Sequence, residues 1–245
     1  MGLTLNIWDL GLVAVVSLQA TVLAYLPQAR SKAIVLSLPI PFTVATLAVG
    51  QRPDLTHILG LSLLFAYTHG VRLLHQRARL PIVPAIGVAA GGYCAAASLL
   101  APRLPRDEAT FWLASCGTFL LAAGLLRALP GRAEPDYRSP LPVWVKLPIV
   151  VAVVLGLVWL KGLLQGFMTL FPMVGVIASY EARHSLWTIG RQIPVLMLAM
   201  VPLIGLGHWG APRLGLGASL LLGWLGYLAV FLFIAWRRRG AEPGA

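Results

Sequence analysis

Apolar stretches about as long as a membrane-spanning helix recur along the whole chain, and short segments with most of the charged residues separate them. A helix of about 20 residues covers the roughly 30 Å of hydrocarbon in a bilayer. The alternating pattern of membrane strands is absent, and the longest polar stretch, 129–142, is too short to bury a core of its own. With 58% hydrophobic residues, the chain is expected to form one all-α, polytopic helical membrane domain over residues 1–245.

The spacing of the apolar stretches predicts nine transmembrane helices. The sixth and seventh are the hardest to separate, because Lys161 and Gly162 alone stand between them. A single helix over 141–181 would be about 60 Å long, twice the thickness of the hydrocarbon. The nine expected helices span 7–26, 32–50, 55–75, 80–101, 109–129, 141–160, 163–181, 186–206 and 214–236.

The basic residues indicate how these helices are oriented. Of the 19 Lys and Arg residues, 13 fall on the side of the C-terminal run Arg237–Arg239, 5 on the other side, and Arg191 within a helix. Cytoplasmic loops of membrane proteins carry the excess of Lys and Arg. We therefore expect a cell inner (plasma) membrane, with the C-terminus in the cytoplasm and the N-terminus outside. The net charge of +11 is then a topology signal, and a nucleic-acid partner is not expected.

A shift of 131 residues superposes the first four predicted helices on the last four and aligns Pro41 with Pro172 and Leu55 with Leu186. An odd linker helix between two such units would invert the second in the membrane, as in many secondary transporters. Helices of similar length also align by chance, so the sequence leaves the inverted repeat open. The first four-helix unit, the linker helix and the second unit would span 7–101, 109–129 and 138–236.

Pro41 and Pro172 lie at the midpoints of the second and seventh predicted helices. A proline inside a helix removes a backbone hydrogen bond, which membrane proteins tolerate where protein groups or a wet cavity supply partners. Half-helices that end there also present positive dipole ends to an anion, although a simple packing kink is the alternative. The candidate substrate-binding residues are these prolines and nearby polar residues: Pro41, Thr43, Thr46, Pro172, Ser179, Tyr180, Arg191 and Gln192.

Three further residues, Glu181, Arg183 and His69, are candidates for coupling or gating. A charged side chain inside the bilayer is disfavoured by about 2.5 to 3.5 kcal/mol and usually finds a partner. Arg191 is therefore expected to pair with Glu181 or to hold an anionic substrate. The alternatives are an ordinary solvated loop for Glu181 and Arg183, snorkelling for Arg191 and an interfacial anchor for His69. No metal site has the required ligand spacing, and no cofactor is expected.

Residues 159–206 contain an apolar helix with the motif Leu170-Phe171-Pro172, an aromatic residue near its end, Tyr180, then a short polar turn and a further apolar helix. These features resemble the GlpM-like small bacterial inner-membrane proteins. The resemblance extends over about a fifth of the chain. It implies a bacterial inner-membrane setting and no particular substrate.

These features favour a secondary transporter or exporter of a small anionic or zwitterionic solute, bound between the second and seventh helices, with Glu181 coupling a proton. The first alternative is an integral-membrane enzyme or flippase for a phosphorylated lipid or isoprenoid. Enzymatic chemistry is less favoured, because the chain has 8 acidic residues and no intramembrane DDxxD or HxxxH set. The second is an accessory subunit of an envelope membrane complex, since Gly and Ala allow close helix packing. The expected partners are the lipid bilayer and a small-molecule or lipid substrate, and an oligomer is left open.

Overall fold

The computed structural model describes residues 7–132, 134–136 and 164–240, together with residues 142, 144, 147, 148, 151, 152, 155 and 156. Within these parts the regular secondary structure is helical and no strand is formed. The all-α fold class predicted from the sequence is therefore confirmed. Most of the predicted helix at 141–160 lies outside the described residues.

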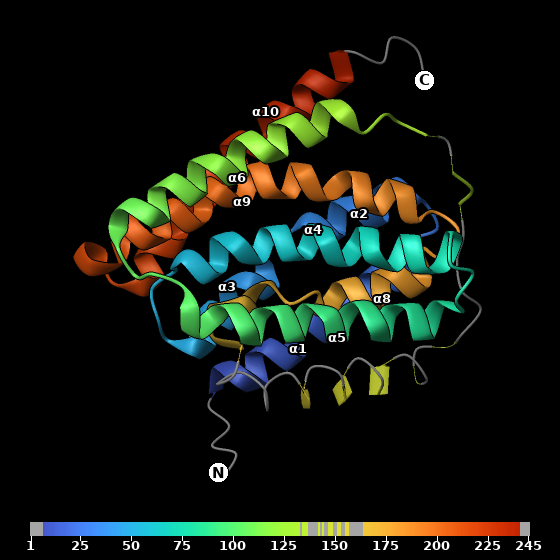
Figure 1. The fold of residues 1–245 in the computed structure, drawn as a ribbon, viewed down its shortest axis with the longest axis horizontal. Coiled ribbons are helices and arrows are strands. Elements are labelled where there is room, and N and C mark those ends of the chain that lie inside the picture. Colours follow the sequence, from blue (N-terminus) through green and yellow to red (C-terminus); the bar gives the residue numbers. More distant parts are fainter. Residues whose placement is uncertain are drawn as a thin grey trace.

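Figure 1 shows the helices running in roughly one direction across the molecule, with α4 and α9 side by side in its middle. Their bounds are α1 Ile7–Tyr25, α2 Ala29–Ser37, α3 Ile40–Val49, α4 Leu55–Gln76, α5 Ile82–Leu100, η1 Ala101–Arg103, α6 Glu108–Ala128, η2 Gln165–Leu170, α8 Met173–Glu181, α9 Leu186–Leu214 and α10 Leu216–Gly240.

Within the described residues, six segments are long and apolar enough to cross a membrane: Ala29–Val49, Leu55–Gln76, Ile82–Arg103, Glu108–Ala128, Leu186–Leu214 and Leu216–Arg237. Two apolar segments, Leu10–Tyr25 and Gly166–Glu181, are shorter. The nine predicted spans are therefore not confirmed as a count, whereas the multi-pass helical architecture is.

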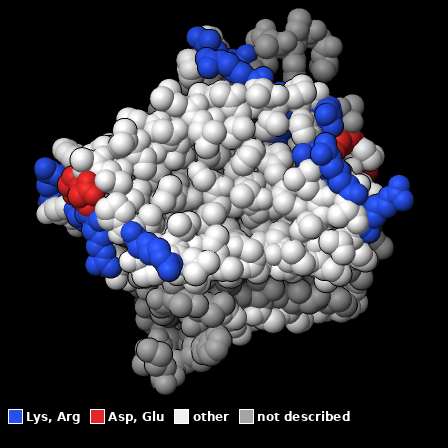
Figure 2. Space-filling model, viewed as in Figure 1, with Lys and Arg blue, Asp and Glu red and all other residues white. Residues whose placement is uncertain are grey.

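Charged side chains gather at the two ends of the helices, and a broad uncharged band separates them on the face seen in Figure 2. Large apolar side chains of the membrane-length helices face outward, with Leu113, Leu120 and Leu221 at least 70% exposed. Water would disfavour so much apolar surface, and the hydrocarbon of a bilayer removes that penalty. The distribution is that of a multi-pass helical membrane protein.

The second predicted helix is broken, but not at the predicted residue. α2 ends at Ser37, Leu38 is extended, and Pro39 is the N-cap of α3. Pro41 lies in the first turn of α3, where the amide that a proline lacks would have no intrahelical partner in any case. The break therefore comes before Pro41, and Pro41 starts the second half-helix.

The seventh predicted helix is broken at Pro172, as expected. The 3-10 helix η2 ends at Leu170, Phe171 is extended, and Pro172 is the N-cap of α8. In Figure 1, α3 and α8 lead away from the middle of the bundle toward opposite ends. The two breaks thus place two helix N-termini in the middle of the molecule.

α9 is the central helix of the fold. In its most apolar 18-residue window 83% of residues are buried, against 22% in the corresponding windows of α6 and α10. It continues to Leu214, beyond the predicted end at residue 206, and contains Pro194, Pro202 and Pro212. Packed neighbouring helices allow a membrane helix to contain prolines without ending.

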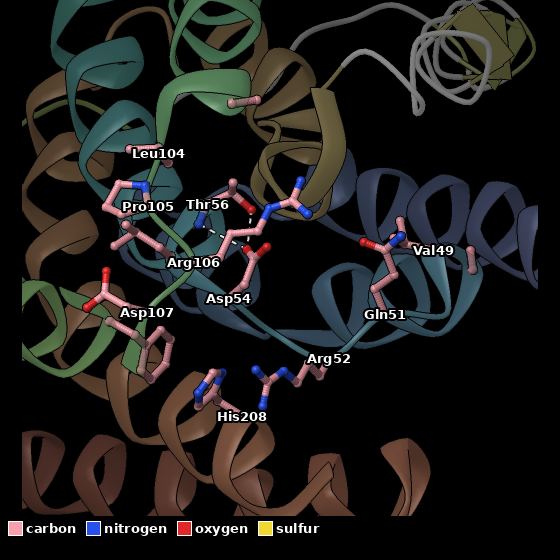
Figure 3. Close-up of a pocket in the computed structure, with 14 residues that line it drawn as sticks. Val49, Gln51, Arg52, Asp54, Thr56, Leu104, Pro105, Arg106, Asp107 and His208 are labelled. Atoms are coloured by element: carbon pink, nitrogen blue, oxygen red, sulfur yellow. Dashed lines mark hydrogen bonds between the residues drawn. The ribbon is translucent and has the colours of Figure 1, made fainter. Parts of the chain in front are cut away.

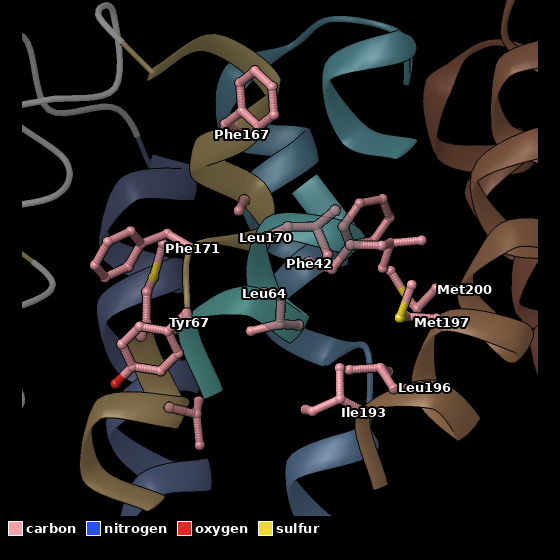
Figure 4. Packing of buried hydrophobic residues seen from close by; sticks show 14 of the residues in the cluster. Phe42, Leu64, Tyr67, Phe167, Leu170, Phe171, Ile193, Leu196, Met197 and Met200 are labelled. Carbon is pink, nitrogen blue, oxygen red and sulfur yellow. The ribbon is translucent and has the colours of Figure 1, made fainter. Parts of the chain in front are cut away.

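The hydrophobic core is densest where α9 and α4 pack against the two broken helices. Figure 4 shows side chains from all of these elements in one cluster, including Phe42 of α3, Leu170 of η2, Leu64 of α4 and Met197 of α9. Each of these side chains is at least 92% buried. The core therefore surrounds the two breaks and holds them in register.

Candidate functional site

A cavity of about 70 Å³, here called the central cavity, lies where the two broken helices meet. Pro39 and Pro41 of the first broken helix, and Phe171 and Pro172 of the second, line its wall. α4 and α9 contribute further sides, mostly with apolar side chains. The volume is enough for several water molecules.

Two tyrosines bind the carbonyl groups that precede the breaks. Tyr227 of α10 donates to the Ser37 carbonyl at 2.7 Å, and Tyr93 of α5 donates to the Phe167 carbonyl at 2.8 Å. Both tyrosines are at least 97% buried. A buried carbonyl left without a partner is strongly unfavourable, so these hydroxyl groups are what allows each helix to stop inside the protein.

Gln19 of α1 has a comparable position at the first break. Its Nε2 donates to the Val35 carbonyl at 2.6 Å and to the Leu38 carbonyl at 3.4 Å. Its Oε1 is buried and has no hydrogen-bond partner among the residues that the structure describes. Gln19 also lines the central cavity.

The other side of each break is a helix N-terminus. Residues at the starts of α3 and α8 border the central cavity: Pro39, Pro41 and Phe42 in the first, and Pro172 to Gly175 in the second. First-turn amides have no partner within their own helix, and the N-terminus carries a partial positive charge. Two such ends beside the Gln19 oxygen suit a small solute that carries both a negative group and a hydrogen-bond donor.

Three of the eight predicted substrate-binding residues, Pro41, Pro172 and Ser179, line the central cavity. Thr43 instead accepts a hydrogen bond from Trp224 Nε1 at 2.9 Å, which ties α3 to α10. Thr46 is fully buried and donates to the Phe42 carbonyl at 2.8 Å.

The other three predicted binding residues lie near the end of the bundle where α8 stops and α9 starts, here called the far end. Tyr180 lies under the guanidinium of Arg183, which also donates to the Tyr180 carbonyl at 3.1 Å. Arg191 Nε donates to the Leu129 carbonyl at 3.1 Å, and Gln192 follows it on α9. Arg191 thus holds the end of α6 rather than lining the central cavity, a role that depends on a chain segment 62 residues away.

The segment after α6 closes over the start of α9. Glu134 accepts from the amides of Trp187 and Thr188 at 3.2 and 2.6 Å, and so caps the N-terminus of α9. The guanidinium groups of Arg72 and Arg132 lie 4.7 and 4.1 Å from the centre of a Trp187 ring. These contacts seal the far end.

His69, a predicted coupling residue, belongs to the same region. Its ring lies 4.2 Å from that of Phe65 and 6.3 Å from that of Trp187, and it leaves little space beside Gly190. It is half-buried and packs between α4 and the start of α9. The structure thus gives His69 a packing role at the far end.

Glu181 is fully buried, not part of a solvated loop. Its main-chain carbonyl accepts a hydrogen bond from Lys32 Nζ at 2.9 Å, and Lys32 is 1% exposed. In the sequence, Lys32 stands at the start of the predicted helix 32–50 and is not among the candidate functional residues. The buried lysine joins the first broken helix to the second, and is therefore a stronger functional candidate than the Glu181 carboxylate.

The opposite end of the bundle holds an open cavity of about 740 Å³, here called the vestibule (Figure 3). The loop before α4 and the loop before α6 form its rim, with Arg52, Asp54, Arg106 and Asp107 among its lining residues. His208 of α9 lies at its base. Among the described residues, no group of three His, Cys, Asp or Glu side chains is placed to hold a metal ion.

Two histidine–carboxylate pairs lie at the vestibule, and the sequence analysis had singled out neither. His208 Nε2 lies 2.8 Å from Glu108 Oε2 and its Nδ1 lies 2.6 Å from the Pro53 carbonyl. Arg52 adds an ion pair to Glu108 at 3.3 Å. The residues of this group come from α6, α9 and the loop before α4, so no local sequence pattern predicts the group.

In the second pair, His57 Nδ1 lies 2.8 Å from Asp54 Oδ1. Asp54 is the N-cap of α4 and accepts from the Thr56 amide at 3.0 Å. The sequence signal for this pair is the spacing Asp-x-x-His at a helix start, which is a capping box with histidine in the usual Glu or Gln position.

Ionisation of the Asp54 carboxyl makes the stability of the fold depend on pH. Burial raises the pKa of its carboxyl, but the hydrogen bond and charge of His57 and hydrogen bonds from Thr56 outweigh this effect and lower the pKa to about 2. A lowered pKa stabilises the fold above the ordinary value of 3.8, and the stabilisation is lost as pH falls toward 2. Because the side chain is 45% exposed, we expect about 1 kcal/mol. Thermal unfolding of wild type and Asp54→Asn from pH 7 to pH 2 should show a difference that shrinks as pH falls below about 4 and is lost near pH 2.

Comparisons of the chain with protein-family models, with curated proteins and with solved structures find no match. The class that the fold defines is a multi-pass helical membrane protein in which two broken helices meet at a small cavity. Its function is argued below from this geometry.

Proposed function

We propose that the protein is a secondary transporter of a small anionic or zwitterionic solute, which binds in the central cavity. The observation that carries this proposal is that the N-termini of α3 and α8, from opposite halves of the chain, border the same cavity. Paired N-termini of discontinuous helices form the substrate sites of several transporter folds. The Gln19 oxygen would accept from an ammonium or hydroxyl group of the same solute.

An inverted repeat belongs to this proposal. In the 131-residue register, α2–α3 corresponds to η2–α8, α4 to α9, and α5 to α10. The packing is reciprocal, because α2 contacts α9 whereas η2 contacts α4. The tyrosine contacts are reciprocal as well: α5 provides Tyr93 to the carbonyl before the second break, and α10 provides Tyr227 to the carbonyl before the first. α4 and α9 also begin at the aligned residues Leu55 and Leu186.

Access to the central cavity would alternate between the two ends of the bundle. The far end is sealed by the Lys32 contact to Glu181 and by the Glu134 cap on α9, whereas the vestibule reaches into the opposite end. By the distribution of Lys and Arg, the far end would face the cytoplasm of a bacterial inner membrane, with the vestibule outside. Glu181 and Arg183 would then act as parts of the inner gate.

The test is solute binding and transport by the purified protein in proteoliposomes. A panel of amino acids, small carboxylates and phosphate esters is screened by thermal shift, and the hits are checked by currents from proteoliposomes adsorbed on a solid-supported membrane. Thr68→Val removes a hydroxyl from the cavity wall at nearly constant volume and should weaken the apparent affinity about tenfold.

Thr118→Val is the matched control, because Thr118 is equally buried on α6 and does not line the cavity. Equal affinities in the two variants would place the solute elsewhere. A panel in which no solute changes the melting temperature or produces a current would contradict the proposal and favour the accessory-subunit alternative.

A further inference from the structure

His57 lies between the vestibule and the central cavity. Its side chain is 2% exposed, and its partner Asp54 lines the vestibule. On its other side, the ring packs edge-on against Phe42, which lines the central cavity, with 6.0 Å between ring centres. Gly166 of η2 approaches so closely that an added Cβ would lie 2.5 Å from His57 Nδ1. His57 therefore contacts parts of both broken helices and shares in any movement of either.

The hydrogen bonds of His57 are compatible with more than one protonation form. Nδ1 lies 3.0 Å from the Asp54 amide, for which it must act as an acceptor, and 2.8 Å from the Asp54 carboxylate, for which it must act as a donor. Nε2 is buried and finds no partner in the described part of the chain. The neutral ring satisfies the amide, and the protonated ring satisfies the carboxylate. Protonation at Nδ1 therefore replaces the hydrogen bond from the Asp54 amide with one to the Asp54 carboxylate, while the hydrogen bond from the Thr56 amide to Asp54 is kept.

His208 differs from His57 in this respect. Both of its ring nitrogens face acceptors, Nδ1 the Pro53 carbonyl and Nε2 the Glu108 carboxylate. Its ring also stacks on Phe111 at 3.8 Å. His208 is thus a matched histidine at the same vestibule with its hydrogen bonds already committed.

The charged surroundings of His57 are simple. On its own helix, Asp54 is the facing charge, and the elements packed against the ring contribute the uncharged Phe42 and Gly166. The vestibule beyond Asp54 holds Arg52, Arg106 and Asp107, with Glu108 engaged by Arg52 and His208. Protonation of His57 would therefore be balanced chiefly by the Asp54 carboxylate.

We propose that His57 is a proton-binding site that couples solute movement to a proton, loaded from the vestibule past Asp54. This inference rests on the proposed transport function. One proton from vestibule water adds to the imidazole, which becomes an imidazolium paired with the Asp54 carboxylate, and release to water reverses the step. An anion that moves with this proton crosses the membrane with its charge neutralised.

The proton site can be tested without a solute. Proteoliposomes on a solid-supported membrane are subjected to a pH jump, and the transient charge displacement is recorded. We expect a displacement in wild type and its loss in His57→Gln, because glutamine keeps the capping box but cannot titrate. The displacement should persist in His208→Gln. In Asp54→Asn, which keeps the N-cap, the displacement should move to lower pH, because the carboxylate charge that balances the proton is lost.

Each outcome separates this inference from the proposed transport function. An unchanged displacement in His57→Gln, or its loss in His208→Gln alone, overturns the assignment of the proton site. Solute-driven currents that are independent of pH and of His57 overturn coupling and leave transport intact. A His57-dependent displacement with no solute response supports the proton site and contradicts the transporter. If His57→Gln does not fold, the shift in Asp54→Asn decides, and an unshifted displacement there overturns the proposal.

Discussion

Replacing Gly166 with alanine is expected to destabilise the protein by roughly 3 kcal/mol or more. Gly166 belongs to η2, and a Cβ atom there would overlap the Thr56 hydroxyl and the ring of His57. Neither neighbour can move freely, because the Thr56 hydroxyl is bonded to Asp54 and His57 belongs to the same capping box. Relief would require η2 to separate from α4, which would also open the core around the second break.

Thermal unfolding in detergent measures this effect, with Gly87→Ala as the control. Gly87 lies in α5, and none of the described atoms comes within 4 Å of the position that its Cβ would take. Alanine there should be neutral or stabilise the helix by up to about 1 kcal/mol. Equal melting temperatures for the two variants would show that η2 does not pack on the start of α4 as described, and would remove the basis for the link between His57 and the second break.

Removal of both tyrosine hydroxyls at the breaks should destabilise the protein by roughly 2 to 6 kcal/mol. Tyr93→Phe and Tyr227→Phe each leave a buried carbonyl without its donor, which costs about 1 to 3 kcal/mol. The two hydroxyls bind different carbonyls, at Phe167 and Ser37, so the effects of the single variants should add approximately. Chemical or thermal unfolding of both single variants and the double variant tests this additivity.

Tyr67→Phe is the control for the tyrosine series. The Tyr67 hydroxyl lies near Ser179, but within the described residues it makes no hydrogen bond of normal geometry. Its loss should therefore change stability little, although the side chain is as buried as that of Tyr93. If all three single variants behave alike, the carbonyl contacts do not support the breaks, and the argument that the two half-helices end for structural reasons fails.

Helix type and membrane class follow from hydropathy alone, because an apolar stretch of about 20 residues has few stable alternatives in lipid. The break at Pro172 is also predictable, since proline removes a hydrogen bond at its own position. The shift of the other break from Pro41 to Pro39 is less so, because Pro39 and Pro41 both suit a first helical turn. Which of them ends the preceding helix depends on the donors from Gln19 and Tyr227.

The sequence-based predictions that the structure does not support concern polar residues whose partners are distant in the sequence. From the sequence, Arg191 is a candidate substrate ligand, whereas in the structure its Nε donates to the Leu129 carbonyl. Lys32 stands at the start of a predicted helix, and nothing in the sequence indicates its hydrogen bond to the Glu181 carbonyl, 149 residues away. The pair of His208 and Glu108 is separated by 100 residues. In each case the chemistry depends on a contact that no local pattern encodes.

The amino-acid sequence alone predicted a bundle of apolar helices, two of them broken, because the length of an apolar stretch and the position of a proline act locally on the backbone. Tertiary packing alone decided that the two helix breaks border the same cavity. It also decided that His57, unlike His208, has a ring nitrogen without a hydrogen-bond partner among the described residues. Those properties arise from the mutual positions of α3, α4, η2 and α9, and short-range backbone preferences do not specify how such helices are placed against one another.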